Sequence, residues 1–153
     1  MFDRSVREVM QKRSVLKAPP QTLVIKAAKL MEKRNVGAVL VVEGDRLLGI
    51  FTERDVTFRV VAHGLDACTT EISKVMTRNP HTIDPDQPLG HALLIMHEHG
   101  FRHLPVIEAG RIIGIVSARS AMDPEMEDFV SEARRREHFQ AVRMAHKRHP
   151  AAR

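Results

Sequence analysis

The sequence predicts an α+β fold in which two similar repeats pack through their sheets as a pseudo-two-fold pair, followed by a C-terminal helix. Residues 41–55 align with residues 106–120 at an offset of 65. Each copy alternates helical and extended patterns in the same order. Apolar residues make up 43% of the chain, and Trp and Tyr are absent, so the cores must be largely aliphatic. A unit of about 60 residues is marginally stable alone, which favours two copies that share buried surface.

The alignment sets the expected boundaries. VVEGDRLLGIFTERD lies on VIEAGRIIGIVSARS, and near the start of each copy VREVM (6–10) lies on ISKVM (72–76) at an offset of 66. We therefore expect one repeat at 1–63, a second at 64–124 and a basic helical tail at 125–153. The positions of the first copy that recur identically are Val41, Glu43, Arg46, Gly49, Ile50 and Arg54.

Each repeat begins with a short helix that ends at a Val-Met pair. The next segments, VLKAPP (15–20) and PHTIDP (80–85), should be extended, since proline disfavours helix there. An amphipathic helix follows in each copy, because apolar residues recur three and four positions apart. These residues are Leu23, Ala27, Leu30 and Met31 in the first copy, and Leu89, Ala92, Leu93 and Met96 in the second.

Two apolar strands come next in each copy. They are VGAVLVV and RLLGIF in the first, and FRHLPVI and RIIGIV in the second. The short connections EGD and EAG are typical of tight hairpins. A final helix should start at Thr52 or Ser117. The expected order in each repeat is thus helix, strand, helix, strand, strand, helix.

Charge is concentrated in the tail. Residues 131–153 contain seven of the 24 basic residues and two of the 19 acidic ones, so residues 1–130 contain 17 of each. A body without net charge disfavours nucleic-acid binding. In the tail, an apolar stripe predicts docking on the pair or on a dimer mate, and a basic arm for nucleic acid or an acidic partner is the alternative. The stripe comprises Met126, Phe129, Val130 and Ala133.

The remaining composition points to a cytoplasmic protein. The longest apolar run, VGAVLVV, is too short to cross a bilayer, and the first residues carry charges where a secretory signal needs an apolar segment. Cys68 is the single cysteine, which fits a reducing compartment, and we expect it to be half-buried.

Metal binding and catalysis find no support in the motifs. His97, His99 and His103 are close in sequence, but no carboxylate or cysteine completes a known ligand spacing. No G-x-S-x-G motif and no Walker loop occurs. We therefore expect no catalytic residues and no metal.

The junction GIFTERD (49–55) allows two interpretations. Thr52 and Asp55 can cap the helix that follows, as in a capping box. The same hydroxyl and helix start can instead receive a phosphate, with the carboxylate holding a ribose. The second copy reads GIVSARS, and Ser120 replaces the acid.

Several motifs taken together resemble the CBS domain, named after cystathionine β-synthase. They are the V-M-T-x-x-P segment at 75–80, the FRHLPV strand, the hairpin ending in Gly-Ile, and G-h-x-[ST]-x-x-[DN] at 49–55. Their order and duplication make the chain similar to a stand-alone CBS pair over residues 6–122. The first repeat departs from the pattern at MQKRS (10–14), which lacks the Thr and Pro.

The resemblance implies a site for an adenosine nucleotide between the repeats. Asp55 would hold the ribose. The phosphate would face Thr52, Arg54, Arg102 and His103. The adenine pocket would comprise Ile50, His81, Thr82, Ile83 and Phe101. A second, weaker cleft would be formed by Leu16, Lys17, Ala18, Gly37, Ala38, Ser117 and Ser120.

The resemblance also implies a regulatory function without catalysis. AMP is the favoured ligand, with ADP, ATP or NAD(H) as alternatives. CBS pairs commonly form homodimers, and an unidentified effector protein would read the bound state. A ligand-free interaction module, with Asp55 as a helix cap, is the main alternative, and a nucleic-acid binder acting through the tail is a weaker one.

Overall fold

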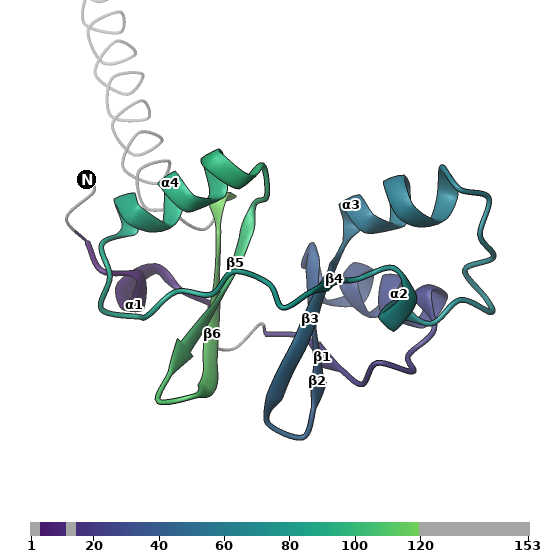
Figure 1. The fold of residues 1–153 in the computed structure, drawn as a ribbon, viewed down its shortest axis with the longest axis horizontal. Helices are drawn as coiled ribbons and strands as arrows, with labels where there is room; N and C mark the ends of the chain where they lie inside the picture. The colour runs from purple at the N-terminus through teal and green to yellow at the C-terminus, as the bar shows by residue number, and fades with distance from the viewer. Residues whose placement is uncertain (1–3, 12–14, 120–153) are drawn as a thin grey trace, which may run out of the picture. The chain divides into compact units, whose positions relative to one another are not determined.

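The computed structural model describes residues 4–11 and 15–119. The elements, in order, are α1 (Val6–Val9), β1 (Lys17–Ala18), α2 (Val24–Arg34), β2 (Ala38–Glu43), β3 (Arg46–Thr52), α3 (Glu53–Asp55), the π-helix η1 (Val56–Val61), the 3-10 helix η2 (Ile72–Lys74), β4 (Thr77–Arg78), α4 (Leu89–His99), β5 (His103–Glu108) and β6 (Arg111–Ser117) (Figure 1). The predicted C-terminal helix lies outside the described residues, as does Ser120.

The two copies build the same hairpin. β2 pairs antiparallel with β3 from Ala38↔Thr52 onward, and β5 pairs with β6 from His103↔Ser117 onward. Both ladders shift register at equivalent places, after Val41 in one and after Val106 in the other. The first hairpin is extended by β1, parallel to β2, and by β4, antiparallel to β3. The duplication read from the sequence is therefore a duplication of structure.

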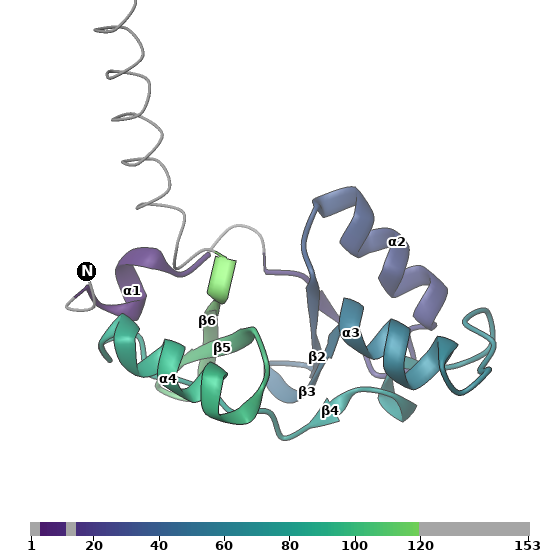
Figure 2. The same cartoon turned by 90° about the horizontal axis from the view of Figure 1, so that it is seen from above.

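The short leading helix of each repeat packs in the other half. Val6 and Met10 join the core formed by α4, β5 and β6, and the Val6 amide donates to Gln87 O at 2.9 Å. Figure 1 shows the purple α1 among the green elements of the second repeat, and Figure 2 shows it beside α4 and β6. Conversely, Ile72, Val75 and Met76 join the core of the first half. Each half is completed by a segment of the other repeat.

This exchange explains why the Val-Met and Gly-Ile motifs occur together. A Cβ placed on Gly49 would lie 2.5 Å from the Met76 sulfur and 2.7 Å from Thr77 O. A Cβ on Gly114 would lie 2.8 Å from the Met10 sulfur. Each methionine therefore rests directly on the glycine of the opposite repeat. The two motifs are the two sides of one packing contact.

The repeats meet through the remaining faces of their hairpins. Ala38, Leu40 and Ile50 from the first sheet pack with Ile115 from the second. The partly buried side chains around them are also aliphatic: Val15, Val42, Leu47 and Ile112. The predicted α+β pair packed through its sheets is confirmed. An aliphatic layer suits this contact, because branched side chains from two facing sheets interdigitate well.

Two local expectations differ from the structure. The strand expected within 80–85 is reduced to one parallel bridge to β5, the counterpart of the β1–β2 pairing, and β4 precedes it as a separate strand that pairs with β3. Asn79, with φ 44°, ends β4, and of the expected segment Ile83 alone forms a bridge, to Val106. Cys68 is exposed, so the prediction of a half-buried thiol is wrong; it lies in a turn where its amide donates to Asp66 Oδ1 at 2.8 Å. No helix within the described ranges has the length and apolarity needed to cross a membrane.

Candidate functional site

An open cleft of about 930 Å³ is bordered by both repeats. One side is the turn through α3 and η1, and the other is the end of α4 with the loop that leads to β5. The lining residues are Glu53, Arg54, Thr57, Phe58, Leu93, Met96, His97, Gly100, Phe101, Arg102 and Ala118. Pockets of about 300–1,000 Å³ accommodate small organic ligands. The size therefore fits a small organic ligand.

Asp55 caps the helix that begins next to this cleft. Its Oδ2 accepts hydrogen bonds from the Thr52 amide at 2.8 Å and from Thr52 Oγ1 at 3.0 Å. The two residues form a capping box. Asp55 is 8% exposed and is the one buried charged residue in the described ranges. The capping role considered for this residue is thus present in the structure, one residue away from the cleft-lining Arg54.

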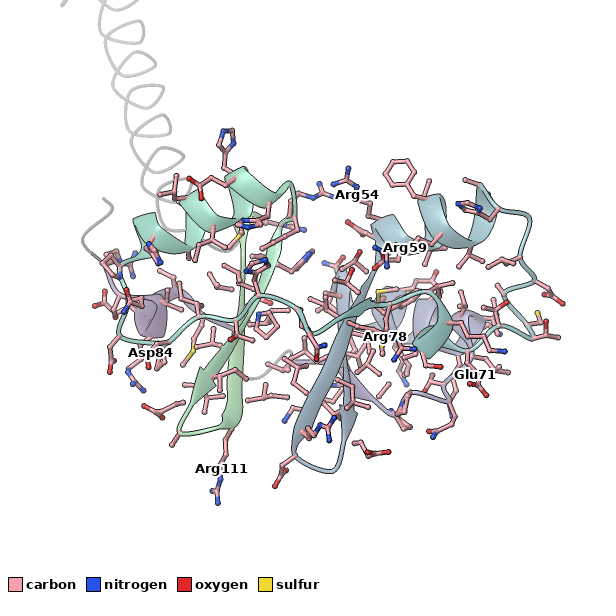
Figure 3. All side chains as sticks on the ribbon, in the orientation of Figure 1. Arg54, Arg59, Glu71, Arg78, Asp84 and Arg111 are labelled. Carbon is pink, nitrogen blue, oxygen red and sulfur yellow. The ribbon has the colours of Figure 1, made fainter. Side chains whose placement is uncertain are left out.

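The other carboxylate oxygen of Asp55 faces Arg59. Arg59 Nε lies 3.3 Å from Asp55 Oδ1. The same guanidinium donates through Nη1 to Val75 O at 3.2 Å and to Met76 O at 2.8 Å. In Figure 3, Arg59 lies on the strand side of the helix. Asp55 is therefore connected through one side chain to the segment that crosses between the repeats.

Three amides around the start of this helix already have partners. The Thr52 amide donates to Asp55, the Glu53 amide donates to Gly37 O at 3.1 Å, and the Asp55 amide takes part in the capping box. These three amides are not available to a phosphate, which would depend largely on side chains. Of the predicted phosphate-binding residues, Arg54 and Arg102 line the cleft, and Thr52 and His103 do not.

Arg54 spans the cleft between the two repeats. Its Nη1 donates to Gly100 O at 2.7 Å, and its guanidinium carbon lies 5.2 Å from the centre of the Phe58 ring. Figure 3 shows Arg54 reaching toward the end of α4. Phe58 is 55% exposed, which is unusual for a large apolar side chain. The pair places a cation and an open aromatic face at the same rim.

Arg102 faces a carboxylate across the cleft. Its Nη2 lies 3.6 Å from Glu53 Oε1, and both side chains are more than half exposed. The Glu53 carboxylate also lies against Gly37, where an added Cβ would be 3.2 Å away. An anionic ligand would therefore compete with Glu53 for Arg102. Glu53 was not among the residues predicted from sequence, although it stands inside the TERD motif.

His103 was predicted to face the phosphate, but its imidazole favours the uncharged form. Burial lowers its pKa, and the neighbouring Arg102 lowers it further, against an opposing effect of Glu53. The imidazole is therefore neutral at pH 7, where it can donate one hydrogen bond but contributes no charge.

Two further aromatic rings gather around Phe101, which lines the cleft. The His81 and His99 ring centres are 4.2 Å apart, and Phe101 lies 5.6 Å from His81 and 5.8 Å from His99. His99 Nδ1 is 3.0 Å from Ile95 O. The structure thus brings together two of the residues predicted for the adenine pocket, His81 and Phe101, and adds His99. Within the described ranges, no cluster of three or more His, Cys, Asp or Glu side chains could hold a metal.

The other residues predicted for the two clefts do not line the cleft described above. Ile50 is buried between the sheets and Ile83 in the core of the second half, while Thr82 is exposed. For the second cleft, Leu16, Ala18 and Ala38 have buried side chains and Lys17 is exposed. These buried residues could offer a ligand main-chain groups only. Ser117 ends β6.

Sequence reasoning missed Arg59, Phe58 and Thr57 as well as Glu53. A usable signal existed for Arg59, because it stands four residues after Asp55 and such a pair shares one helix face. Phe58 carried no comparable signal, since a lone aromatic residue on a helix is usually expected in a core.

Comparison with known proteins places this geometry in a family. The CBS-domain family model matches residues 6–62 and 72–124. "CBS domain-containing protein YhcV" of Bacillus subtilis is 36% identical over 113 residues, covering 74% of this chain and 79% of that protein. The first curated relatives are longer: this chain spans 18% of the length of "CBS domain-containing protein CBSCBSPB1" of Arabidopsis thaliana, with 42% identity over 100 residues and 65% of this chain covered.

Solved structures share the fold. A putative signal-transduction protein with CBS domains from Burkholderia ambifaria has a TM-score of 0.77 and 31% identity, covering 82% of this chain and 96% of that one. The CBS domain pair of protein MJ0100, in complex with 5′-methylthioadenosine and S-adenosyl-L-methionine, has a TM-score of 0.70 and 26% identity, covering 76% and 95%. CBS domain protein PAE2072 from Pyrobaculum aerophilum, complexed with AMP, has a TM-score of 0.70 at 24% identity, covering 76% and 89%. With two matches of the family model in tandem and this exchange of leading helices, the chain belongs to the CBS domain family.

Proposed function

We propose that the chain is a regulatory module that binds an adenosine nucleotide, AMP foremost, in the cleft between its two repeats. The observation that carries the proposal is the composition of the cleft. Its walls come from both repeats and present the guanidinium groups of Arg54 and Arg102 together with the Phe101 ring. A cleft built by two repeats lets a bound molecule influence how they are held together.

The chemistry of these side chains matches the parts of a nucleotide. Guanidinium groups form strong, charge-assisted hydrogen bonds with phosphate oxygens. Aromatic rings stack on bases, an interaction of about 1–3 kcal/mol per base. A carboxylate accepts hydrogen bonds from ribose hydroxyls. Asp55 is the candidate for this last role, because it lies in the same turn as the cleft-lining Arg54.

The relatives support the ligand class. The MJ0100 pair was solved with two adenosyl compounds and PAE2072 with AMP. The adenosine part is common to all of them, and the phosphate is not. We place AMP first because Arg54 and Arg102 supply two cations at the cleft that can bind its phosphate. ADP, ATP and NAD(H) contain the same adenosine part and are the alternatives.

The module would act without catalysis. Ligand binding would change the angle between the two repeats. An effector protein, or a second copy in a cytoplasmic homodimer, would respond to that change. The size of the response is bounded by the difference in ligand affinity between the two states.

A thermal-shift series tests the proposal. AMP, ADP, ATP, NAD, NADH and S-adenosylmethionine are added in turn to the wild type, to Asp55→Asn and to Asp66→Asn. Asp66 is the matched control, because its carboxylate also accepts a main-chain hydrogen bond but lies outside the cleft. We expect AMP to raise the melting temperature of the wild type and of Asp66→Asn, and to have little effect on Asp55→Asn. The absence of any shift with all six compounds would overturn the proposal.

One observation favours a second candidate, a ligand-free interaction module. Asp55 already has partners at both oxygens, and Arg102 already faces Glu53. A chain whose polar groups are satisfied internally can hold its fold with an empty cleft. In that case the six compounds leave the melting temperature unchanged, while Asp55→Asn still lowers it.

A further inference from the structure

We propose that Asp55 and Arg59 form a relay, in which the state of the Asp55 carboxylate sets how tightly Arg59 holds the segment that crosses between the repeats. The inference deepens the proposed function and rests on it for the identity of the ligand. The relay itself is a property of the chain and can be tested without a ligand.

The first step is the hydrogen-bond capacity of Asp55. A carboxylate offers about four acceptor positions, two on each oxygen. Thr52 uses two of them on Oδ2, through its amide and its hydroxyl. Arg59 forms an ion pair with the other oxygen, Oδ1, at 3.3 Å. A ribose with two hydroxyl groups needs acceptor positions on the oxygen that the cap leaves open, so binding through both hydroxyls brings the ribose into competition with Arg59 at Oδ1.

The second step is to compare the contacts at the two oxygens. The Thr52 bonds measure 2.8 and 3.0 Å and cap the helix, whereas Arg59 Nε is 3.3 Å away. The Arg59 side chain is 46% exposed, so water can solvate its guanidinium group when it separates from Asp55. The Arg59 contact is therefore the one that a ribose displaces.

The third step is what Arg59 holds at its other end. Its Nη1 donates to both Val75 O and Met76 O. Met76 rests on Gly49 of β3, and the Asn79 amide three residues later donates to Leu48 O at 3.1 Å. Arg59 is thus placed to fix the segment that leaves the first half for the second. When Asp55 no longer orients the guanidinium, this hold weakens.

The internal repeat provides a natural comparison. At the offset of 65, Asp55 corresponds to Ser120 and Arg59 to Pro124, so the second copy has neither member of the relay. The equivalent of Met76 is Met10, whose amide donates to Val6 O at 2.8 Å, as the Met76 amide donates to Ile72 O at 2.8 Å. The Met10 amide is therefore a matched control for hydrogen-exchange measurements at the Met76 amide.

Amide hydrogen exchange, measured by NMR on the full chain, tests the relay. Four proteins are compared without ligand: wild type, Asp55→Asn, Arg59→Met and the double variant. We expect each single change to speed exchange several-fold at the Met76 and Asn79 amides, with no change at Met10. Because both act through one contact, the double variant should exchange no faster than Arg59→Met. Arg59→Lys, which keeps the charge, should restore part of the protection.

Additive effects of the two changes, or equal effects at Met10 and Met76, would overturn the relay. AMP added to the wild type and to Arg59→Met completes the test. The relay predicts that AMP speeds exchange at Met76 and Asn79 in the wild type relative to Met10, and that Arg59→Met binds AMP several-fold more tightly. If AMP binds but Arg59→Met weakens it, the displacement step is wrong. If AMP does not bind and the ligand-free results hold, the proposed ligand fails and the relay stands.

Discussion

Asp55 accepts two hydrogen bonds from Thr52 and, through its other oxygen, faces Arg59 one helical turn later. One buried carboxylate therefore closes the start of a helix and anchors a side chain that reaches the opposite repeat's leading segment. The capping and ligand-binding interpretations of the TERD motif use the same carboxylate group. They can be separated only by variants that affect one role more than the other.

Asp55→Ala should destabilise the ligand-free protein, and Asp55→Asn should do so less. Alanine removes the acceptor of two hydrogen bonds from Thr52, and hydrogen bonds to charged groups contribute about 1.5–3 kcal/mol each to the free energy of unfolding. Asparagine keeps one acceptor oxygen and loses the charge that faces Arg59. Urea unfolding of both variants measures the difference. Equal stability of wild type and Asp55→Ala would show that the cap contributes nothing.

Gly49→Ala should destabilise the protein more than Gly114→Ala. The new methyl group at Gly49 meets both the Met76 sulfur and the rigid Thr77 carbonyl, at 2.5 and 2.7 Å. At Gly114 the nearest main-chain atom is Gln11 O at 3.2 Å, and the flexible Met10 side chain can move. Overpacking of this kind costs about 1–3 kcal/mol. A melting temperature lower for Gly114→Ala than for Gly49→Ala would refute the proposed packing.

Stability should fall as the pH drops below the ordinary pKa of histidine, about 6.5. Burial lowers the pKa of His103 in the folded state, so the unfolded chain binds its proton first. Protonation therefore favours unfolding between that value and the lower pKa of the folded state, while above pH 6.5 the effect is absent. His103→Gln should flatten this part of the curve of unfolding free energy against pH. An unchanged slope in the variant would count against a lowered pKa for His103 in the folded state.

Glu53→Gln should strengthen the binding of phosphate-bearing ligands and leave phosphate-free ones unchanged. The carboxylate of Glu53 competes with a ligand phosphate for Arg102. Exposed ion pairs are worth about 0–1 kcal/mol, which limits the gain in AMP affinity to about fivefold. 5′-Methylthioadenosine, which lacks phosphate, is the matched control ligand. An equal gain for both ligands would show that Glu53 does not act through charge.

Local patterns were sufficient to predict most of the elements. The spacing of Ala92, Leu93 and Met96 predicted α4, and the apolar runs on either side of EGD and EAG predicted the hairpins. These features depend on neighbouring residues, so a single sequence carries them. The duplication strengthened each prediction because both copies had to agree.

Contacts between distant segments were not predictable in the same way. Nothing in VREVM indicates that Val6 packs in the core of the second half, since its apolar pattern suits either core. Arg59 reads as an ordinary exposed helix residue until Val75 O and Met76 O are placed beside it. Likewise Glu53 and Arg102 are 49 positions apart in the sequence, and only the fold brings them to one cleft.

Isothermal titration calorimetry of AMP into the wild type and Asp55→Asn tests the central claim most directly. The account predicts one AMP per chain in the wild type, because Asp55 and both cleft arginines serve the same one of the two predicted clefts. It predicts that Asp55→Asn weakens this binding by about tenfold to a hundredfold, the loss expected for a hydrogen bond to a charged group. No heat of binding in the wild type, or equal affinity in Asp55→Asn, would contradict it.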